Sequence, residues 1–234
     1  PYPTGDLYAA VEVLAARLAT RLSRRYRAAR RGAMDMKRTV QAGFRRGEQP
    51  AVLKRKRRKI DRRQLVVLCD ISGSVHRVSR FFLKLVHQMQ DQFSRTRSFV
   101  FVDRLVETTE LFAQGPFDKA LDRLEKDRQF NLFGRSDYGR ALYQFYDEYL
   151  PSLSRKTVLV VLGDARNNHF EPLEWTLEEA SRRVHTLLWL NPDARREWDR
   201  DDSVVSAYAP YCDRVLECRN LRQLEEAGRL LLRR

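Results

Sequence analysis

Alternating oxygen-bearing side chains follow an apolar segment in the second quarter of the chain. Residues 65–69 form a continuous apolar run, and Asp70, Ser72 and Ser74 come directly after it. In an extended or gently turning segment these side chains point to one side, and Gly73 lets the backbone bend without a Cβ clash. One carboxylate and two hydroxyls are the oxygen ligands that Mg²⁺ and similar hard cations take. The alternative is a strand-to-helix turn in which a serine merely caps the helix.

Two further oxygen donors come from later segments. Asp164 follows the apolar run 157–162, and Ser136 lies in a polar loop before a predicted helix. Its neighbour Asp137 is expected to cap that helix. Two carboxylates and three hydroxyls around a divalent ion give a site of about zero net charge, with one coordination position left for an acidic group of a partner. The predicted metal ligands are therefore Asp70, Ser72, Ser74, Ser136 and Asp164.

Strand and helix patterns alternate from residue 64 onward. Continuous apolar runs predict strands buried on both faces, and apolar spacings of three and four predict helices. The alternation indicates an α/β, doubly wound, mostly parallel sheet of the Rossmann-like kind, whose ligands bind beyond the carboxyl ends of the strands. The predicted strands are 65–69, 98–102, 106–112, 157–162, 184–190 and 214–217; the predicted helices are 74–93, 117–124, 138–150, 174–183 and 221–232.

The charge of the chain is concentrated at its front. The net charge is +14, and all of this excess falls within residues 1–64. Apolar spacing predicts a helix over 7–22 that continues to a stop at Gly32, and a second, shorter helix over 34–44. We therefore divide the chain into a basic, largely helical extension and connector, residues 1–63, and an α/β domain, residues 64–234. The six cations of 54–59 suit a phosphate-bearing ligand, either nucleic acid or anionic lipid. Alternatively, the segment is a solvated connector or a strand that faces an acidic partner protein.

Several enzyme classes are disfavoured by motifs that the sequence lacks. It contains no P-loop, no Gly-x-Gly-x-x-Gly after a strand and no Gly-x-Ser-x-Gly. A phosphatase with Asp70 as nucleophile is disfavoured because Ser72 stands where a second carboxylate would act as acid and base. The three cysteines favour a reducing compartment, and no apolar stretch is long enough to cross a membrane. We expect a cytoplasmic protein that is not an enzyme.

The residues quoted above resemble a known constellation. Asp70-x-Ser72-x-Ser74 after an apolar strand, a hydroxyl loop, and Asp164 after a later strand are similar to the metal-ion-dependent adhesion site (MIDAS) of von Willebrand factor type A domains. The wider sequence, over about residues 30–230, resembles one branch of these domains, the CoxE-like proteins. The segments that carry this resemblance are Arg30-Arg31-Gly32, Asp35-Met36-Lys37-Arg38-Thr39, residues 68–74, residues 136–142 and residues 188–192.

The resemblance implies a metal-dependent protein-binding module. In such modules the hydroxyls bind Mg²⁺ (or Mn²⁺ or Ca²⁺), the aspartates often act through water, and a partner carboxylate completes the site. The implied partners are a MoxR-type AAA+ ATPase and a metalloenzyme client that is assembled or activated. Two residues depart from the pattern. Ser136 stands where many relatives carry Thr, and Arg166 could weaken cation binding or meet the partner's acid. The alternative function is nucleic-acid binding through the basic front.

Overall fold

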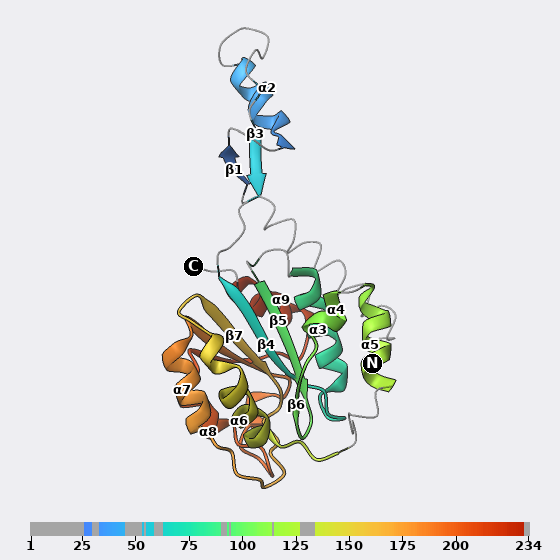
Figure 1. Cartoon of the computed structure of the whole chain (residues 1–234), viewed down its shortest axis with the longest axis vertical. Helices are drawn as coiled ribbons and strands as arrows, with labels where there is room; N and C mark the ends of the chain where they lie inside the picture. The colour runs from blue at the N-terminus through green and yellow to red at the C-terminus, as the bar shows by residue number, and fades with distance from the viewer. Residues whose placement is uncertain are drawn as a thin grey trace.

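The structure, a computed structural model, describes residues 26–29, 33–44, 53, 55–58, 63–89, 93, 95–113, 115–126 and 134–231. These residues form a three-stranded sheet from the front of the chain and a six-stranded sheet from the remainder (Figure 1). Helices cover both faces of the larger sheet, as the sequence pattern predicts. The predicted α/β fold with a mostly parallel sheet is confirmed.

The larger sheet has the strand order β6-β5-β4-β7-β8-β9. Only β5 and β6 pair antiparallel among these strands, and the other neighbouring pairs are parallel. The chain runs from β4 outward to β5 and β6 and then crosses back to β7, so the strand order reverses between β4 and β7. The strands are β4 (Gln64–Asp70), β5 (Arg95–Phe101), β6 (Leu105–Glu107), β7 (Thr157–Leu162), β8 (Thr186–Asn191) and β9 (Arg214–Glu217).

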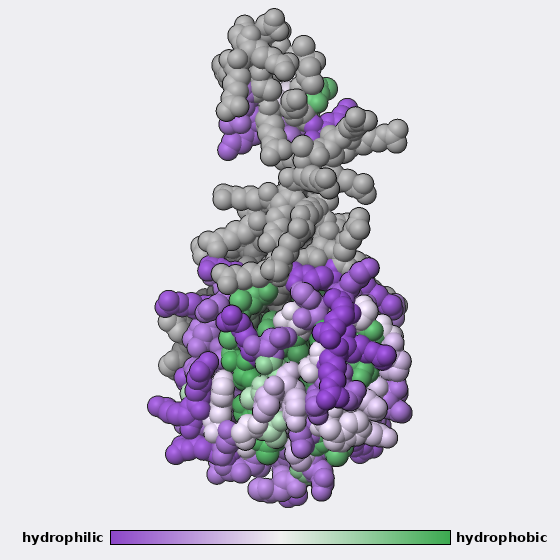
Figure 2. Space-filling model, turned by 90° about the vertical axis from the view of Figure 1, so that its left-hand side faces the viewer, coloured by the Kyte–Doolittle hydropathy of each residue, from purple (hydrophilic) through white to green (hydrophobic). Residues whose placement is uncertain are grey.

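Seven helices of the described chain form the two outer layers. The first layer contains α3 (His76–Met89), α4 (Thr109–Ala113), α5 (Phe117–Lys126) and α9 (Leu221–Leu231). The second contains α6 (Tyr138–Glu148), α7 (Trp175–Arg183) and α8 (Val205–Tyr208). Figure 2 looks onto the side that carries α7, where hydrophilic residues surround a band of apolar ones.

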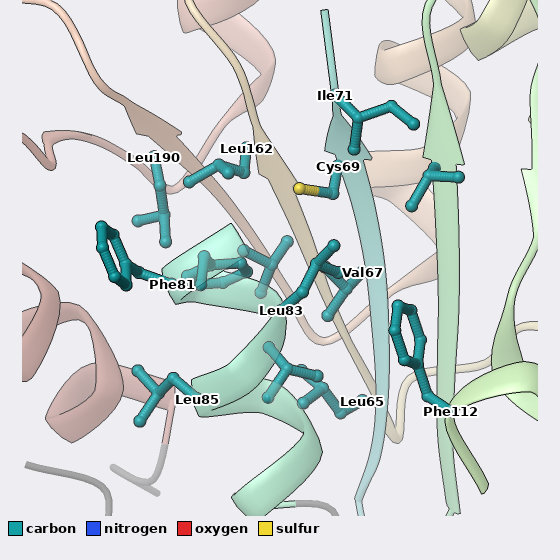
Figure 3. Packing of buried hydrophobic residues seen from close by; sticks show 14 of the residues in the cluster. Leu65, Val67, Cys69, Ile71, Phe81, Leu83, Leu85, Phe112, Leu162 and Leu190 are labelled. Carbon is teal, nitrogen blue, oxygen red and sulfur yellow. The ribbon is translucent and has the colours of Figure 1, made fainter. Parts of the chain in front are cut away.

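Strand β4 lies at the centre of both hydrophobic cores. Leu65, Val67 and Cys69 pack on the α3 side of the sheet, where Figure 3 shows them beside the helix. The alternate residues Val66 and Leu68 belong to the core under α6 and α7. Burial of both faces explains why the strand reads as an uninterrupted apolar run. Each such side chain contributes about 1.5–3 kcal/mol relative to leaving it in water, so the strand is a rigid support for the loop that follows it.

The segment that the sequence predicts as one edge strand, 106–112, divides into two elements. β6 is an antiparallel edge strand, and α4 begins at Thr109. Thr108 ends the strand by donating its amide to the Ser98 carbonyl, and its own carbonyl accepts the first helical bond from the Phe112 amide. The prediction of a strand to residue 112 is therefore wrong. The Phe112 ring instead stacks on the Phe117 ring of α5, with 5.4 Å between their centroids.

The described part of the front region is a small antiparallel sheet with one helix. Its strands, in the order β1-β3-β2, are β1 (Tyr26–Ala29), β3 (Arg55–Arg58) and β2 (Ala33–Met34), and its helix is α2 (Met36–Phe44). The second predicted helix is thus confirmed, whereas the first does not continue to Gly32, because residues 26–29 pair with β3. The segment 7–22 lies outside the described residues. The division at residue 63 stays a prediction.

Candidate functional site

The point where the strand order reverses carries both predicted aspartates. Asp70 is the last residue of β4, and Asp164 follows the end of β7 by two residues. The two strands are parallel neighbours, with Cys69 opposite Leu162. Carboxyl ends of parallel strands meet at one edge of the sheet, and at a reversal the connections leave in opposite directions, which opens room for a ligand.

Hydrogen bonds join four of the five predicted ligands. The Ser72 amide donates to Asp70 Oδ1 at 2.8 Å, and the Ser72 and Ser74 hydroxyl oxygens lie 3.3 Å apart. The Ser74 hydroxyl donates to Asp164 Oδ2 at 2.7 Å, which links the first loop to the β7 loop across 90 residues of sequence. Ser74 is exposed, whereas Asp70 and Asp164 are only 0% and 2% exposed. The Asp-x-Ser-x-Ser segment is therefore linked to Asp164 through Ser74, and the role of these four residues as metal ligands stays a prediction.

The fifth predicted ligand, Ser136, lies in the loop that precedes α6. This loop is held by the Asp137 amide, which donates to the carbonyl of Val102, the residue after β5. Asn168 Nδ2 also donates to the Ser136 carbonyl, at 2.9 Å. Ser136 is buried. The hydrogen bonds that the structure gives for Ser136 run through its carbonyl rather than its hydroxyl, so its role as a ligand stays a prediction. Asp137 caps α6 by accepting from the Arg140 amide, which confirms its expected role.

Sequence reasoning missed Tyr138, the first residue of α6. Its hydroxyl donates to Asp70 Oδ2 at 2.6 Å and lies 3.3 Å from Asp164 Oδ1. The Ala165 amide donates to the same phenol oxygen at 3.2 Å. Burial raises the pKa of Tyr138 well above its usual value, so the phenol keeps its proton at neutral pH. The only sequence signal was its position, two residues after the hydroxyl of Ser136.

The electrostatics of the two aspartates favour a bound cation. Burial, together with the charge of Asp164, raises the pKa of Asp70 to about 7, although the hydrogen bonds from Tyr138 and Ser72 act in the opposite direction. Burial likewise raises the pKa of Asp164 above its ordinary value. Two ionised carboxylates in this place repel each other and lack solvation, and a divalent cation relieves both penalties.

Arg166 lies beside Asp164, and its guanidinium is shared among several acids. Its Nε is 3.7 Å from Asp164 Oδ2, and its terminal nitrogens lie 3.2 Å from Asp193 and 3.1 Å from Asp202. A further carboxylate, that of Asp201, is 3.8 Å away. Three acids and one arginine are thus added to the five predicted residues, so the surroundings are more acidic than the sequence estimate of about zero net charge.

The loop after β7 has an unusual backbone. Ala165, Asn168, His169 and Leu173 adopt positive φ angles of 60°, 50°, 62° and 45°. Such conformations are strained for residues other than glycine and concentrate at functional sites, where surrounding contacts hold them. Here the Asp164 carbonyl accepts from Ser203 Oγ at 2.9 Å and from Asn191 Nδ2 at 3.4 Å. The backbone just before Ala165 is therefore held by hydrogen bonds from the end of β8 and from Ser203.

The oxygen atoms of the candidate site are the kind of ligand that a hard cation such as Mg²⁺ binds. Within the described ranges there is no group of three or more His, Cys, Asp and Glu side chains that could hold a metal. The candidate site instead combines two carboxylates with serine hydroxyls, and it contains no nitrogen or sulfur ligand of the kind that soft metals prefer. No helix of the described chain is both long and apolar enough to cross a membrane.

Comparison with solved structures finds the same fold in several proteins. Proximal thread matrix protein 1 from the mussel byssus, with a zinc-occupied MIDAS motif, has a TM-score of 0.51 and 13% identity, over 74% of this chain and 46% of that one. The von Willebrand factor type A protein from Catenulispora acidiphila has a TM-score of 0.48 and 14% identity, over 76% and 42%. This chain spans less than half the length of either protein. At such identities the likeness concerns the fold alone.

No curated protein matches the sequence. A family model, described as VWA domain containing CoxE-like protein, matches residues 7–227. The match takes in the larger sheet, both candidate aspartates and the basic front region, so it covers nearly the whole chain. The chain belongs to the CoxE-like family of proteins that contain a von Willebrand factor type A domain.

Proposed function

We propose that this protein is a metal-dependent adaptor that binds an acidic side chain of a partner protein. The observation that carries the proposal is the hydrogen-bonded set of Asp70, Ser72, Ser74 and Asp164 at the point where the strand order reverses. With Ser136, these residues would hold Mg²⁺. A bound Mg²⁺ supplies a hard Lewis acid with an open coordination position, to which a partner carboxylate binds.

The partner proposed from the family resemblance is a MoxR-type AAA+ ATPase, with a metalloenzyme as client. The chain itself has no P-loop, so ATP hydrolysis would come from the partner. Mg²⁺ is the first choice because all donors are oxygen, and Mn²⁺ or Ca²⁺ would suit the same donors. A zinc-occupied MIDAS motif in the mussel protein supports a divalent ion at this kind of site.

We propose further that the protein acts without catalysing a reaction, in the cytoplasm. Asp164 is engaged by the Ser74 hydroxyl and the Arg166 amide, and Asp70 by Tyr138 and the Ser72 amide. These contacts account for both carboxylates as parts of a ligand-holding loop, and Ser72 stands where a second carboxylate would act as acid and base beside a nucleophilic Asp70. The three free cysteines are consistent with a reducing compartment. Mg²⁺-dependent hydrolysis of a generic phosphate ester that Asp70→Asn abolishes would overturn this part of the proposal.

A pull-down with a purified MoxR-type ATPase tests the adaptor function. Wild-type chain should retain the ATPase in Mg²⁺ and lose it in EDTA, and Asp70→Asn should lose at least about tenfold in affinity, which is about 1.4 kcal/mol. Asp103→Asn is the matched control, because Asp103 follows the end of the neighbouring strand β5 and stands outside the proposed ligand set. Equal binding by wild type in Mg²⁺ and in EDTA would contradict a metal-dependent contact.

Nucleic-acid binding is the second candidate function, and the small sheet is the observation that favours it. β3 consists of Arg55, Lys56, Arg57 and Arg58, and its pairing with β1 places Arg57 directly opposite Arg27. Cations gathered in this way can follow a phosphate backbone and release counterions. Mutation distinguishes the two candidate functions, because metal-dependent protein binding depends on Asp70 and nucleic-acid binding depends on the cations of β3.

A further inference from the structure

Tyr138 occupies a position that the proposed ligand set does not explain. Its side chain is fully buried, and its phenol oxygen lies between the Asp70 and Asp164 carboxylates, at 2.6 and 3.3 Å. The residue comes from α6, whereas the aspartates come from the ends of β4 and β7. One hydroxyl from a third element therefore contacts both predicted acidic ligands.

The hydrogen bonds of the two carboxylates show what the phenol adds. Asp70 Oδ1 accepts from the Ser72 amide, and Asp164 accepts from the Arg166 amide at Oδ1 and from the Ser74 hydroxyl at Oδ2. Tyr138 supplies the bond to the remaining oxygen, Asp70 Oδ2. A phenol has one proton, and the shorter distance assigns it to Asp70. The same oxygen accepts from the Ala165 amide, which belongs to the Asp164 loop.

The surrounding chain is built to fit this phenol. A Cβ at Gly163 would lie 2.0 Å from the Tyr138 oxygen, so the residue before Asp164 must be glycine for the hydroxyl to stay in place. The Tyr138 ring stacks on Trp189 at 5.8 Å and meets Phe101 edge-on at 5.0 Å. Its amide donates to Asn167 Oδ1 at 2.8 Å. Ring, amide and hydroxyl are thus each held by a different neighbour.

We propose that Tyr138 is a positioning residue for the metal site, one that orients both aspartates toward the cation. This inference rests on the proposed metal function. The phenol satisfies the Asp70 oxygen that the loop 70–74 leaves open, and through the Ala165 amide it couples that carboxylate to the Asp164 loop. Partners of this kind, one step removed from the metal, typically change metal affinity by about 10–100-fold when they are removed.

The test compares Tyr138→Phe with Tyr208→Phe in the chain of residues 1–234. Both tyrosines are buried and belong to the aromatic group around Trp189, and both use their hydroxyls, but the Tyr208 hydroxyl donates to the Pro172 carbonyl. Calorimetric titration with MgCl₂ should show affinity weakened about 10–100-fold in Tyr138→Phe and unchanged within about twofold in Tyr208→Phe. Urea unfolding in EDTA should show similar stability losses in both variants, so a purely structural role would not separate them.

Each result decides the inference. If wild type binds Mg²⁺ and the two variants bind it equally, the role of Tyr138 is refuted while the metal site stands. If wild type itself fails to bind Mg²⁺, the proposed metal site fails and the inference fails with it. Should Tyr138→Phe not fold, Gly163→Ala displaces the phenol oxygen without removing it, and wild-type affinity in that variant would equally refute the proposal.

Discussion

At the scale of single residues, two buried aspartates determine the chemistry of the site. Asp70 and Asp164 lie at adjacent strand ends, and the nearby Arg166 guanidinium is shared with Asp193 and Asp202. Arg166 therefore neutralises only part of their charge. A pair of buried carboxylates without full compensation destabilises the folded chain, because desolvation and mutual repulsion both oppose ionisation. The proposed divalent cation would remove that penalty, so its binding would stabilise the folded chain.

This coupling predicts a pH-dependent stability in the absence of metal. The pKa of Asp70 is about 7 in the folded chain, against about 3.9 when unfolded. The folded state therefore binds the proton more tightly, and the free energy of unfolding in EDTA should fall as the pH rises from about 4 through 7. Urea denaturation between pH 5 and 8 measures this slope, which Asp70→Asn should flatten. Mg²⁺ at pH 8 should restore the lost stability in wild type alone, and parallel slopes for both proteins would contradict the expectation.

The sequence predicted the part of the site that local pattern determines. Alternation after an apolar strand places Asp70, Ser72 and Ser74 on one loop, and the rule that parallel strands end at one edge adds Asp164. Tyr138 could not be predicted in this way. Its phenol acquires a role only because the start of α6 packs over the end of β7, where a glycine leaves room for it. This contact depends on how the two elements pack in three dimensions, and the spacing of residues along the chain does not predict it.

At the scale of elements, burial explains which predictions were correct. The core strands β4 and β7 were predicted closely because strands buried on both faces require continuous apolar residues. The edge segment 106–112 carries a mixed pattern that suits either a strand or a short helix, and tertiary contacts decide between them. There Thr108 bonds to Ser98, and Phe112 packs on Phe117, which favours a helix after three residues of strand.

The hairpin of β5 and β6 is stabilised by a bidentate ion pair. Arg97 Nε and Nη2 donate to the two Glu107 carboxylate oxygens at 2.9 and 2.7 Å, and its guanidinium lies 4.9 Å from the Tyr149 ring centroid. The hydrogen bonds from Arg97 lower the pKa of Glu107 below its ordinary value. Planar pairing of this kind is stronger than a single surface contact.

We expect Glu107→Gln to lower the free energy of unfolding at pH 7 by about 1 kcal/mol, the upper end for a pair that solvent partly screens. Because the folded pKa is lowered, the stabilisation is present above the unfolded value of about 4.3 and is lost as the pH falls below it. Urea denaturation at pH 7 and pH 3 should thus show a difference between the two proteins only at pH 7. Glu110→Gln, at an exposed position of α4, serves as control. A difference that persists at pH 3 would assign the effect to packing instead.

At the scale of the whole molecule, charge and chemistry occupy different parts of the chain. The net positive charge lies within residues 1–64, whereas the candidate metal site belongs to the larger sheet. The family match begins at residue 7, so the basic front is part of the family pattern. Figure 1 draws the small sheet beyond the end of the larger sheet at which β4 begins, and Asp70 lies at the other end of β4. Under the proposed function, a basic region in this place would attract an acidic partner from a distance, while the candidate metal site would make the specific contact.

Charge reversal on β3 tests this division of roles. In the pairing of β3 with β1, Arg57 lies opposite Arg27, and like charges directly opposite each other destabilise a sheet. Arg57→Glu replaces a pair of like charges by a pair of opposite charges and should therefore preserve the small sheet. Together with Arg55→Glu, it lowers the net charge of the chain by four. The pair Lys119→Glu and Arg123→Glu on exposed positions of α5 makes the same change elsewhere and is the control.

We expect the β3 double variant to associate with the proposed MoxR-type ATPase about tenfold more slowly at low salt, because steering by charge acts mainly on the association rate. Surface plasmon resonance at several salt concentrations measures this, and the difference from wild type should shrink as salt screens the charges. Dissociation and Mg²⁺ affinity should not change, since both depend on Asp70 and its neighbours. The contrary result would be that wild type binds duplex DNA or RNA tightly, with an affinity that falls steeply as salt is added, and that the β3 variant loses this binding. Nucleic acid would then be the ligand of the basic region.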